Sequence, residues 1–245
     1  MNVRRQAQAM GGEVTGGAPG PAALDWLAAA RIDPAVSALR PDYRALLLVV
    51  EGLVPGPSDA WSEALLAAAE RQAPSADHPH AQAWADAFRA FGAKPQRTRP
   101  SLTALLRRAP GLPRVDRLTD AYNAVSVRHA VPVGGEDLDA YRGPIRLTRA
   151  AGDEPFETVA AGEPVIEAPE PGEVVWGDDA GVTCRRWNWR QCTRTRLTTT
   201  TTRAVFVFDA LEPMADAALA AAGDELSAAL LDGSPHARLR RRILR

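Results

Sequence analysis

The chain has 245 residues, with 29 basic and 30 acidic side chains and a formal net charge of -1. A chain so close to neutrality is not expected to coat nucleic acid over its whole surface, so any such contact is expected to be local. Hydrophobic residues make up 46% of the chain, enough for a large core, and no apolar run approaches the roughly 20 residues of a membrane span. We expect a cytoplasmic protein without a signal peptide and without membrane contact.

The first half of the chain predicts helices around one strand. Residues 1–20 are rich in Gly, Ala and Gln without periodicity and predict a disordered tail, and residues 21–245 are expected to form a single domain. A short helix is predicted after residue 21, and residues 36–39 are expected to start a strand or to connect elements. The continuous apolar run over 43–52 predicts a buried strand. Helices follow over 59–72, capped by Ser58, over 80–91, and over 101–108, capped by Ser101.

The second half changes from helix to strand patterns. Residues 116–130 form a strong amphipathic helix pattern, and strands are predicted at 145–148, 156–159, 172–177 and 181–184. The last two are joined by a turn signal at 178–180 and predict a hairpin. The β-branched run over 198–208 predicts a buried strand, 214–231 an alanine-rich helix, and 238–245 a small basic tail. This order predicts an α+β or three-layer α/β-like fold with N-terminal helices, a mixed β-sheet and a C-terminal helix.

Several common chemistries lack their motifs. The chain has no phosphate-binding loop ending in Lys-Ser/Thr, no dinucleotide fingerprint and no nucleophile elbow. Cys184 and Cys192 are expected to be free thiols. His78 and His80 have no neighbouring ligands in the sequence, so neither a metal nor another cofactor is expected. Ser126 shares a helix face with a histidine three residues on; a Ser–His dyad is one interpretation, and a structural pair is the commoner one.

Two stretches carry candidate binding groups. Gly134 and Gly135 let the backbone approach a ligand closely, and Glu136 or Asp137 could hold a water or a ribose hydroxyl. The alternative is a plain turn with solvated acids. Residues 184–203 carry six arginines, two tryptophans and no acidic residue. Guanidinium groups between indole rings suit a ligand that has both phosphates and flat groups, and an exposed cationic hairpin is the alternative.

Three motifs together resemble the free-standing B3/B4 domain proteins. They are DAYNAVSVRHAVPVGGED over 120–137, PGEVVW over 171–176, and RRWNWRQ over 185–191 with Thr195, and the resemblance is strongest over 90–232. Those proteins are similar to the B3/B4 domain of the phenylalanyl-tRNA synthetase beta subunit, which hydrolyses tyrosine mischarged onto phenylalanine tRNA. The resemblance implies a tRNA partner, no DNA, and deacylation of a mischarged aminoacyl-tRNA. Such an ester needs mainly a positioned water and a stabilised oxyanion.

The resemblance also implies roles for particular residues. Catalytic groups that orient water and the terminal ribose would be Asn123, Glu136 and Asn188. Substrate-binding groups would be Ser126, Gly134, Gly135, Arg186, Trp187 and Trp189. Phosphates of the RNA would meet Arg185, Arg190, Arg194 and Arg196. Gly134 and Cys192 stand where the synthetase domain has a histidine and a glutamate, so its specificity is not carried over. The alternatives are a non-catalytic RNA- or tRNA-binding module and a site for a free amino-acid-like small molecule.

Overall fold

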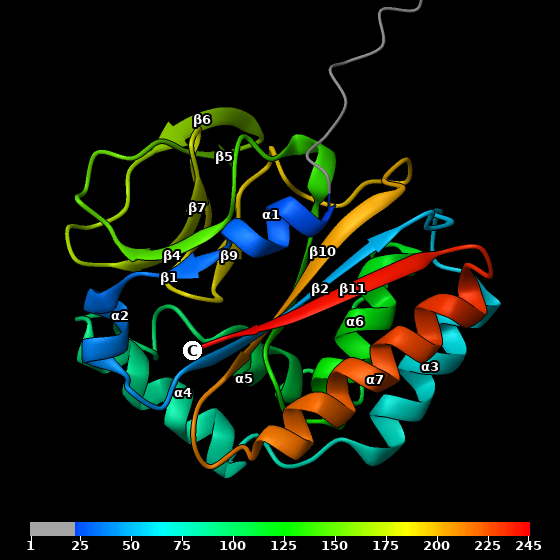
Figure 1. Ribbon diagram of the computed structural model, residues 1–245. Helices are drawn as coiled ribbons and strands as arrows, with labels where there is room; N and C mark the ends of the chain where they lie inside the picture. The colour runs from blue at the N-terminus through cyan, green and yellow to red at the C-terminus, as the bar shows by residue number, and fades with distance from the viewer. Residues whose placement is uncertain (1–22) are drawn as a thin grey trace, which may run out of the picture.

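The longest strands form a sheet of four antiparallel strands in the order β11-β2-β10-β3 (Figure 1). The structure is a computed structural model that describes residues 23–245, so the tail expected over 1–20 lies outside the described residues. The two central strands are β2 (Arg44–Glu51) and β10 (Arg203–Ala210). The outer strands are β3 (Val133–Asp137) and β11 (Arg238–Leu244). The buried strand expected over 43–52 is therefore confirmed.

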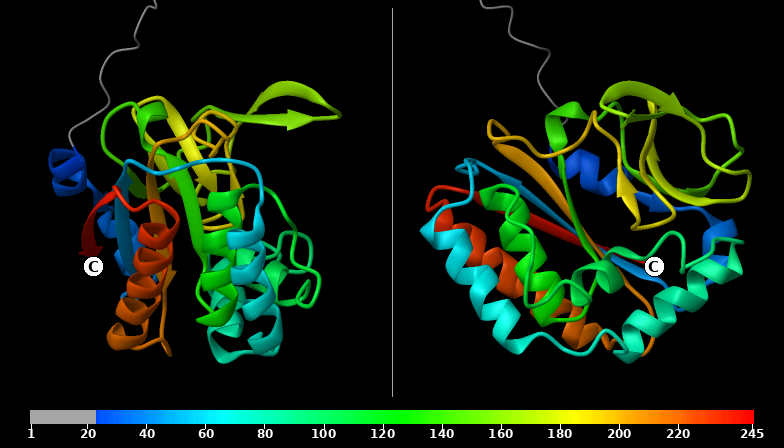
Figure 2. Two further views of the ribbon diagram at one scale, coloured as in Figure 1. Left: turned by 90° about the vertical axis from the view of Figure 1, so that its right-hand side faces the viewer. Right: turned by 180° about the vertical axis from the view of Figure 1, so that it is seen from behind.

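Both faces of this sheet are covered, which explains the uninterrupted apolar run of β2. Helices α3 (Ala60–Gln72), α6 (Arg117–Arg128) and α7 (Asp216–Gly233) lie together on one side of it (Figure 2). Leu46, Leu48 and Phe206 belong to the buried cluster on that side. Leu47, Val49 and the rest of the alternate set belong to the cluster on the opposite face. Because successive strand residues alternate in direction, a strand buried on both faces has no polar positions.

A second sheet of five short strands lies on that opposite face. Its order is β1 (Arg31–Ile32), β4 (Arg146–Arg149), β7 (Val174–Asp178), β8 (Gly181–Arg185) and β9 (Arg190–Gln191). Strand β1 pairs parallel to β4, and the other pairs are antiparallel. The expected hairpin around 178–180 is formed by β7 and β8. A separate hairpin of β5 (Phe156–Ala160) and β6 (Glu163–Glu167) projects from the molecule (Figure 2).

The remaining elements are short or lie around the sheets. They are α1 (Ala23–Ala29), α2 (Pro34–Leu39), α4 (Pro79–Ala90), α5 (Ser101–Leu106) and the 3-10 helix η1 (Leu138–Ala140). The mixture of helices with a mainly antiparallel sheet confirms the α+β fold. No helix within residues 23–245 combines the length and apolar character needed to cross a membrane.

Several local predictions are wrong. Ser101 is the first residue of α5 and not its cap, and its hydroxyl has no hydrogen-bond partner within the described residues. Residues 36–39 belong to helix α2, because Asp33 caps it through the Ala35 amide. Asp59 caps α3, whereas Ser58 donates to a buried carboxylate, Asp120. Residues 198–202 form a turn closed by threonine hydroxyls, and the strand begins only at 203. Residues 238–244 are a strand, because they form backbone hydrogen bonds with the outer edge of β2. The sequence of this basic segment alone does not show that such a partner is available.

Candidate functional site

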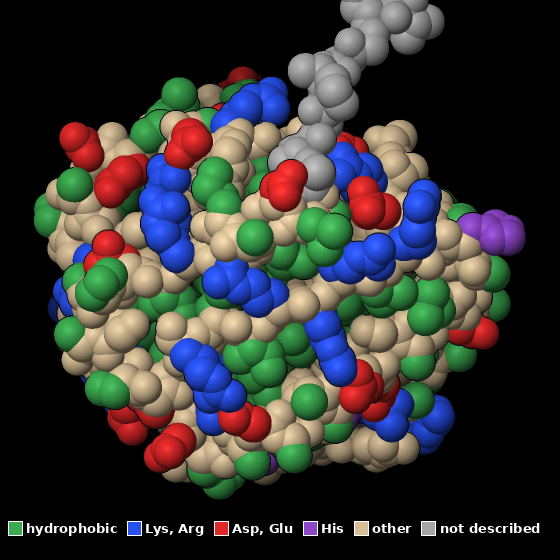
Figure 3. Space-filling view, in the orientation of Figure 1, with side chains coloured by type: hydrophobic (Ala, Val, Ile, Leu, Met, Phe, Trp, Pro, Cys, Tyr) green, Lys and Arg blue, Asp and Glu red, His purple; other side chains and the backbone are tan. Residues whose placement is uncertain are grey.

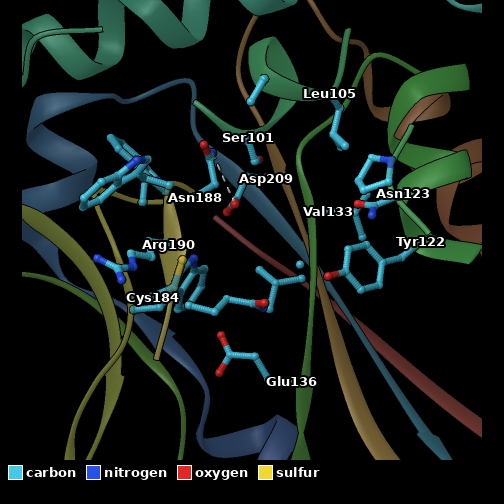
Figure 4. Close-up of a pocket in the computed structure, with 18 of the residues that line it drawn as sticks. Ser101, Leu105, Tyr122, Asn123, Val133, Glu136, Cys184, Asn188, Arg190 and Asp209 are labelled. Atoms are coloured by element: carbon cyan, nitrogen blue, oxygen red, sulfur yellow. Dashed lines mark hydrogen bonds between the residues drawn. The ribbon is translucent and has the colours of Figure 1, made fainter. Parts of the chain in front are cut away.

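A cavity of about 260 Å³ opens where the two sheets approach α5 and α6 (Figure 4). Helix α5 contributes Ser101 and Leu105, and α6 contributes Asn123. Strand β3 contributes Glu136, and Asp209 comes from the end of β10. The segment after β8 supplies the remaining wall with Trp187, Asn188, Trp189, Arg190 and Gln191.

A tight turn after β8 aims that segment at the cavity. Arg186 and Trp187 both have positive φ, at 48° and 66°, a left-handed conformation that is unfavourable for residues other than glycine. Glu173 accepts from the Arg186 amide at 3.1 Å, and the Trp187 amide donates to the Val174 carbonyl at 2.7 Å. These bonds hold a strained turn, which sends the Trp187 ring into the core beside Tyr43, at 4.9 Å between ring centroids.

The acid of the PGEVVW motif is the partner of the neighbouring arginines. Glu173 accepts two parallel hydrogen bonds of 2.9 Å from Arg185, whose side chain also donates to Glu167 at 2.9 Å. In the same way Arg194 donates to Asp178 with two bonds of 2.8 and 2.9 Å. The structure thus gives Arg185 and Arg194 carboxylate partners inside the protein, in place of the RNA phosphates expected. Paired guanidinium and carboxylate groups of this geometry are strong structural contacts.

Other predicted residues also have structural positions outside the cavity lining. The Arg186 side chain approaches Glu173 at 3.4 Å and stacks over Trp189 at 4.5 Å. Ser126 donates its hydroxyl to the Val131 carbonyl at 2.6 Å, so no Ser–His dyad is formed. A Cβ on Gly135 would meet Leu197 at 2.8 Å, so close packing there excludes a side chain. Arg196 is exposed and lies beside a different hollow. The structure brings together Asn123, Gly134, Glu136, Trp187, Asn188, Trp189 and Arg190.

Glu136 is a buried carboxyl with its hydrogen bonds on one oxygen. Tyr141 and Thr195 both donate to Oε2, at 2.6 and 2.8 Å. Burial raises the pKa of Glu136, although both hydroxyl groups oppose the shift. Gly134 and Glu136 are two residues apart on β3, so they lie on the same face of the strand, the face toward the cavity. Their partners on β10 are Val207 and Val205.

Asp209 is the second buried carboxyl of the cavity and was not foreseen from the sequence. Tyr43 donates to its Oδ1 at 2.5 Å, and the Asn188 amide lies 3.5 Å from its Oδ2 (Figure 4). Burial raises the pKa of Asp209 to about 7, against hydrogen bonds that favour its charged form. One feature of the sequence could have indicated it: Asp209 directly follows the apolar run 204–208, and a buried strand rarely ends in an unpaired charge.

Two amides complete the polar lining of the cavity. The Asn123 side chain has no hydrogen-bond partner among residues 23–245, and it lies across the cavity from Asn188 (Figure 4). The Oδ1 atom of Asn188 is buried and is also without a partner within the described part of the chain. Buried polar atoms of proteins are almost always hydrogen-bonded, so these two amides are available to a ligand.

Comparison with known proteins identifies the family. The B3/4 domain family matches residues 83–222, more than half of the chain. This chain belongs to the B3/4 domain family. No curated protein matches it. Among solved structures, it is similar to an N-terminal fragment of the phenylalanyl-tRNA synthetase beta-subunit from Pyrococcus horikoshii, with 15% identity and a TM-score of 0.43. The similarity covers 88% of this chain and 50% of the other, so the chain spans about half of that fragment.

The two thiols and His80 of this B3/4 domain are buried and make structural contacts. Both cysteines are free and buried, and burial raises the pKa of each thiol, so neither is an activated nucleophile. His80 donates to the Ala130 carbonyl at 2.7 Å and accepts from the Leu211 amide at 3.0 Å. Within residues 23–245, no group of three His, Cys, Asp or Glu side chains could hold a metal ion.

Proposed function

We propose that this B3/4 domain hydrolyses the ester bond of a mischarged aminoacyl-tRNA. The observation that carries the proposal is the cavity with two buried carboxyls, Glu136 and Asp209, together with the Asn123 amide and the Asn188 Oδ1 atom, which lack hydrogen-bond partners within the described residues. The family resemblance supplies the class of substrate, and the cavity supplies groups that can perform the reaction. Aminoacyl-tRNA is used in translation, so we place the protein in the cytoplasm.

The size of the cavity suits the aminoacyl group. Sites for drug-sized ligands span ~300–1,000 Å³, so 260 Å³ is below that range. An amino acid fits such a space, whereas an amino acid together with a whole nucleoside does not. The indole rings of Trp187 and Trp189 and the Leu105 side chain form apolar walls for the amino-acid side chain. The α-amino group of the ester is cationic, and a buried carboxylate such as Glu136 is a suitable partner for it.

The proposed reaction needs one base and one oxyanion donor. Asp209 has a pKa of about 7, so about half of it is ionised at neutral pH and able to accept a proton. Water attacks the ester carbonyl carbon while its proton moves to the Asp209 carboxylate. The amide N–H groups of Asn123 or Asn188 donate to the carbonyl oxygen as it becomes negative. The carbon–oxygen bond to the ribose then breaks, and Asp209 returns the proton to the leaving oxygen.

A deacylation panel with purified protein tests this proposal. We expect the wild type to accelerate hydrolysis of at least one mischarged tRNA over buffer. Asp209→Asn should lower the rate about 100-fold or more, the usual contribution of a general acid–base group. Asn188→Ala should lower it by a similar factor, as expected for an oxyanion donor. Glu136→Gln should weaken binding of the ester, because it removes the partner of the α-ammonium group. Rates with Asp209 present should rise with pH up to about 7 and then level off.

The control is Asp224→Asn, which removes an exposed carboxylate that pairs with Arg241 far from the cavity. It should leave the rate unchanged. Absence of any acceleration across the panel would overturn the proposal, as would full activity of Asp209→Asn.

A second candidate function is binding of a free amino-acid-like molecule without hydrolysis. The same carboxyls would hold its ammonium group, and the tryptophans would contact its side chain. Calorimetric titration with free amino acids separates the two. Saturable binding with no deacylation supports this candidate, whereas deacylation without free amino-acid affinity supports the first.

A further inference from the structure

The strongest uncompensated positive charge of the described chain lies outside the arginine-tryptophan stretch. Between Asp86 and Asp116 the sequence has seven basic residues and no acid. Two of these seven form ion pairs: Arg89 with Asp86, and Arg114 with Glu63 and Glu70. The other five are all exposed: Lys94, Arg97, Arg99, Arg107 and Arg108. None of these five has a carboxylate within 4.0 Å among residues 23–245.

The arginine-tryptophan stretch shows the opposite behaviour. Its cationic side chains are largely neutralised, because Arg185 and Arg186 share Glu173, and Arg194 pairs with Asp178. Of the four residues expected to meet RNA phosphates, Arg190 lines the cavity and donates only to the Val159 carbonyl. A surface that binds phosphates needs cations that are not already paired. Five such cations lie together in the segment 94–108, called here the basic arm, whereas the arginine-tryptophan stretch has Arg190 and Arg196.

Helix α5 places the basic arm between two hollows. Ser101 and Leu105 of α5 line the candidate site, together with Arg108, which follows the helix. Thr103 of α5 and Arg107, the residue that ends the helix, line another hollow of about 290 Å³, which also receives Arg89 and Arg99. One acid, Asp77, lines that second hollow. The backbone amide of Ser101 donates to the Asn188 carbonyl at 3.2 Å, which fixes α5 against the candidate site.

Spacing along an RNA strand fits this arrangement. A helix with its side chains is about 10 Å across, so the two hollows are separated by roughly the length of three stacked nucleotides at 3.4 Å each. Arg108 and Arg190 both line the cavity, so they meet the phosphate nearest an ester seated inside it. Arg99 and Arg107 then lie along the path of the next phosphates.

We propose that the basic arm binds the phosphodiester backbone of the single-stranded 3′ end of an RNA, which crosses α5 from the cavity into the second hollow. The proposal rests on the proposed function for the identity of the partner and adds the docking surface. It replaces Arg185 and Arg194 with Arg99, Arg107 and Arg108 as phosphate contacts.

Binding of uncharged tRNA and of a single-stranded RNA 12-mer, measured by fluorescence anisotropy between 50 and 300 mM salt, tests the proposal without any chemistry. We expect the triple variant Arg99→Gln, Arg107→Gln, Arg108→Gln to weaken binding at least tenfold near 0.15 M salt. The slope of log K against log salt should fall by about 2, because each single-strand phosphate contact contributes about 0.7. All three side chains are exposed, so thermal unfolding should be unchanged.

The matched control is Arg238→Gln with Arg240→Gln on β11. Both are exposed arginines, and β11 is at the opposite edge of the sheet from β3, which lines the cavity. Basic and acidic side chains are interspersed on the face that carries β11 (Figure 3). This variant should bind RNA like the wild type.

Three outcomes would overturn the proposal: no RNA binding by the wild type, equal loss in the β11 control, or stronger adsorption to phosphatidylglycerol vesicles than to RNA. The result is separate from that of the proposed function. RNA binding that the triple variant loses, with no deacylation in the panel, would support the docking surface and reject the hydrolase. Deacylation by the wild type, together with unaltered RNA affinity of the triple variant, would support the hydrolase and reject the docking surface.

Discussion

Asp209 is a residue whose burial opposes the stability of the protein. A carboxyl group removed from water favours its neutral form, and here the pKa rises from 3.8 to about 7. Tyr43 and Asn188 compensate part of this penalty through their hydrogen bonds. Residues that are unfavourable for folding are often kept for function, and the position of Asp209 in the cavity fits that pattern.

The effect of replacing Asp209 by Asn on the free energy of unfolding should therefore be more favourable at neutral pH than at acid pH. Between pH 4 and 7 the folded wild type retains a proton that the unfolded chain has released, so its stability falls as pH rises. The variant has no titratable carboxyl at this position, so this pH dependence is absent from it. We expect the difference in unfolding free energy, variant minus wild type, to become more favourable by up to roughly 4 kcal/mol from pH 4 to pH 8. Urea unfolding at both pH values measures it, and a difference independent of pH would contradict the assignment.

His80 should have the opposite pH dependence. Burial lowers its pKa from 6.5 to about 4, against the hydrogen bond to Ala130. As pH falls from 6.5 to 4, the unfolded chain takes up a proton that the folded chain does not, so stability is lost. His80→Asn should lower stability at pH 7 but remove about 3 kcal/mol of the acid-dependent loss. Unfolding curves at pH 7 and pH 4.5 test this, and a parallel decrease in both proteins would contradict it.

At the scale of elements, the β7–β8 hairpin and the turn after it form the frame of the site. The turn carries two residues of positive φ, and Glu173 binds both the Arg185 side chain and the Arg186 backbone. The carboxylate therefore links the end of β8 to the start of β7. Loss of this link should release the turn that positions Asn188 and Trp189.

Glu173→Gln should destabilise the protein strongly. The Arg185 side chain is only 7% exposed, so the change leaves a buried guanidinium without half of its charge partners. Breaking a buried pair in this way typically costs about 3–5 kcal/mol. Glu163→Gln, at an exposed position on β6, is the matched control and should change stability by less than about 0.5 kcal/mol. Similar thermal unfolding of both variants would contradict the structural role.

The sequence predicted those elements whose signals are local. The apolar run of β2 and the 3.6-residue pattern of α6 depend only on neighbouring residues, and both are present in the structure. Seven of the predicted site residues line the cavity, because the B3/B4 motifs contain them, and their roles stay predictions. The carboxylate partners of Arg185 and Arg194 could not be read from the sequence, because Glu173 and Asp178 lie 12 and 16 residues before them and only folding brings them together. Asp209 was missed for the same reason.

At the scale of the whole molecule, the acidic and basic side chains of the proposed site occupy different places. Two acidic groups are buried in the cavity, whereas the unpaired cations of the basic arm are exposed, with Arg108 at the cavity and Arg99 and Arg107 at the second hollow. A neutral chain can thus present a locally cationic surface, as its composition indicated. The location of that surface could not be read from composition, because the most arginine-rich stretch is neutralised by acids from other elements.

The pairing of β11 with β2 also sets an order of events during synthesis. Strand β2 is made early and β11 late, and at ~5–20 residues per second the outer edge of β2 stays unpaired for roughly 10 to 40 s. Residues 46–50 of β2 are Leu-Leu-Leu-Val-Val, a run with high tendency to associate with other strands. During that interval this edge is open to pairing with other strands. The arginines of β11 then cover this edge and present charge to any further strand.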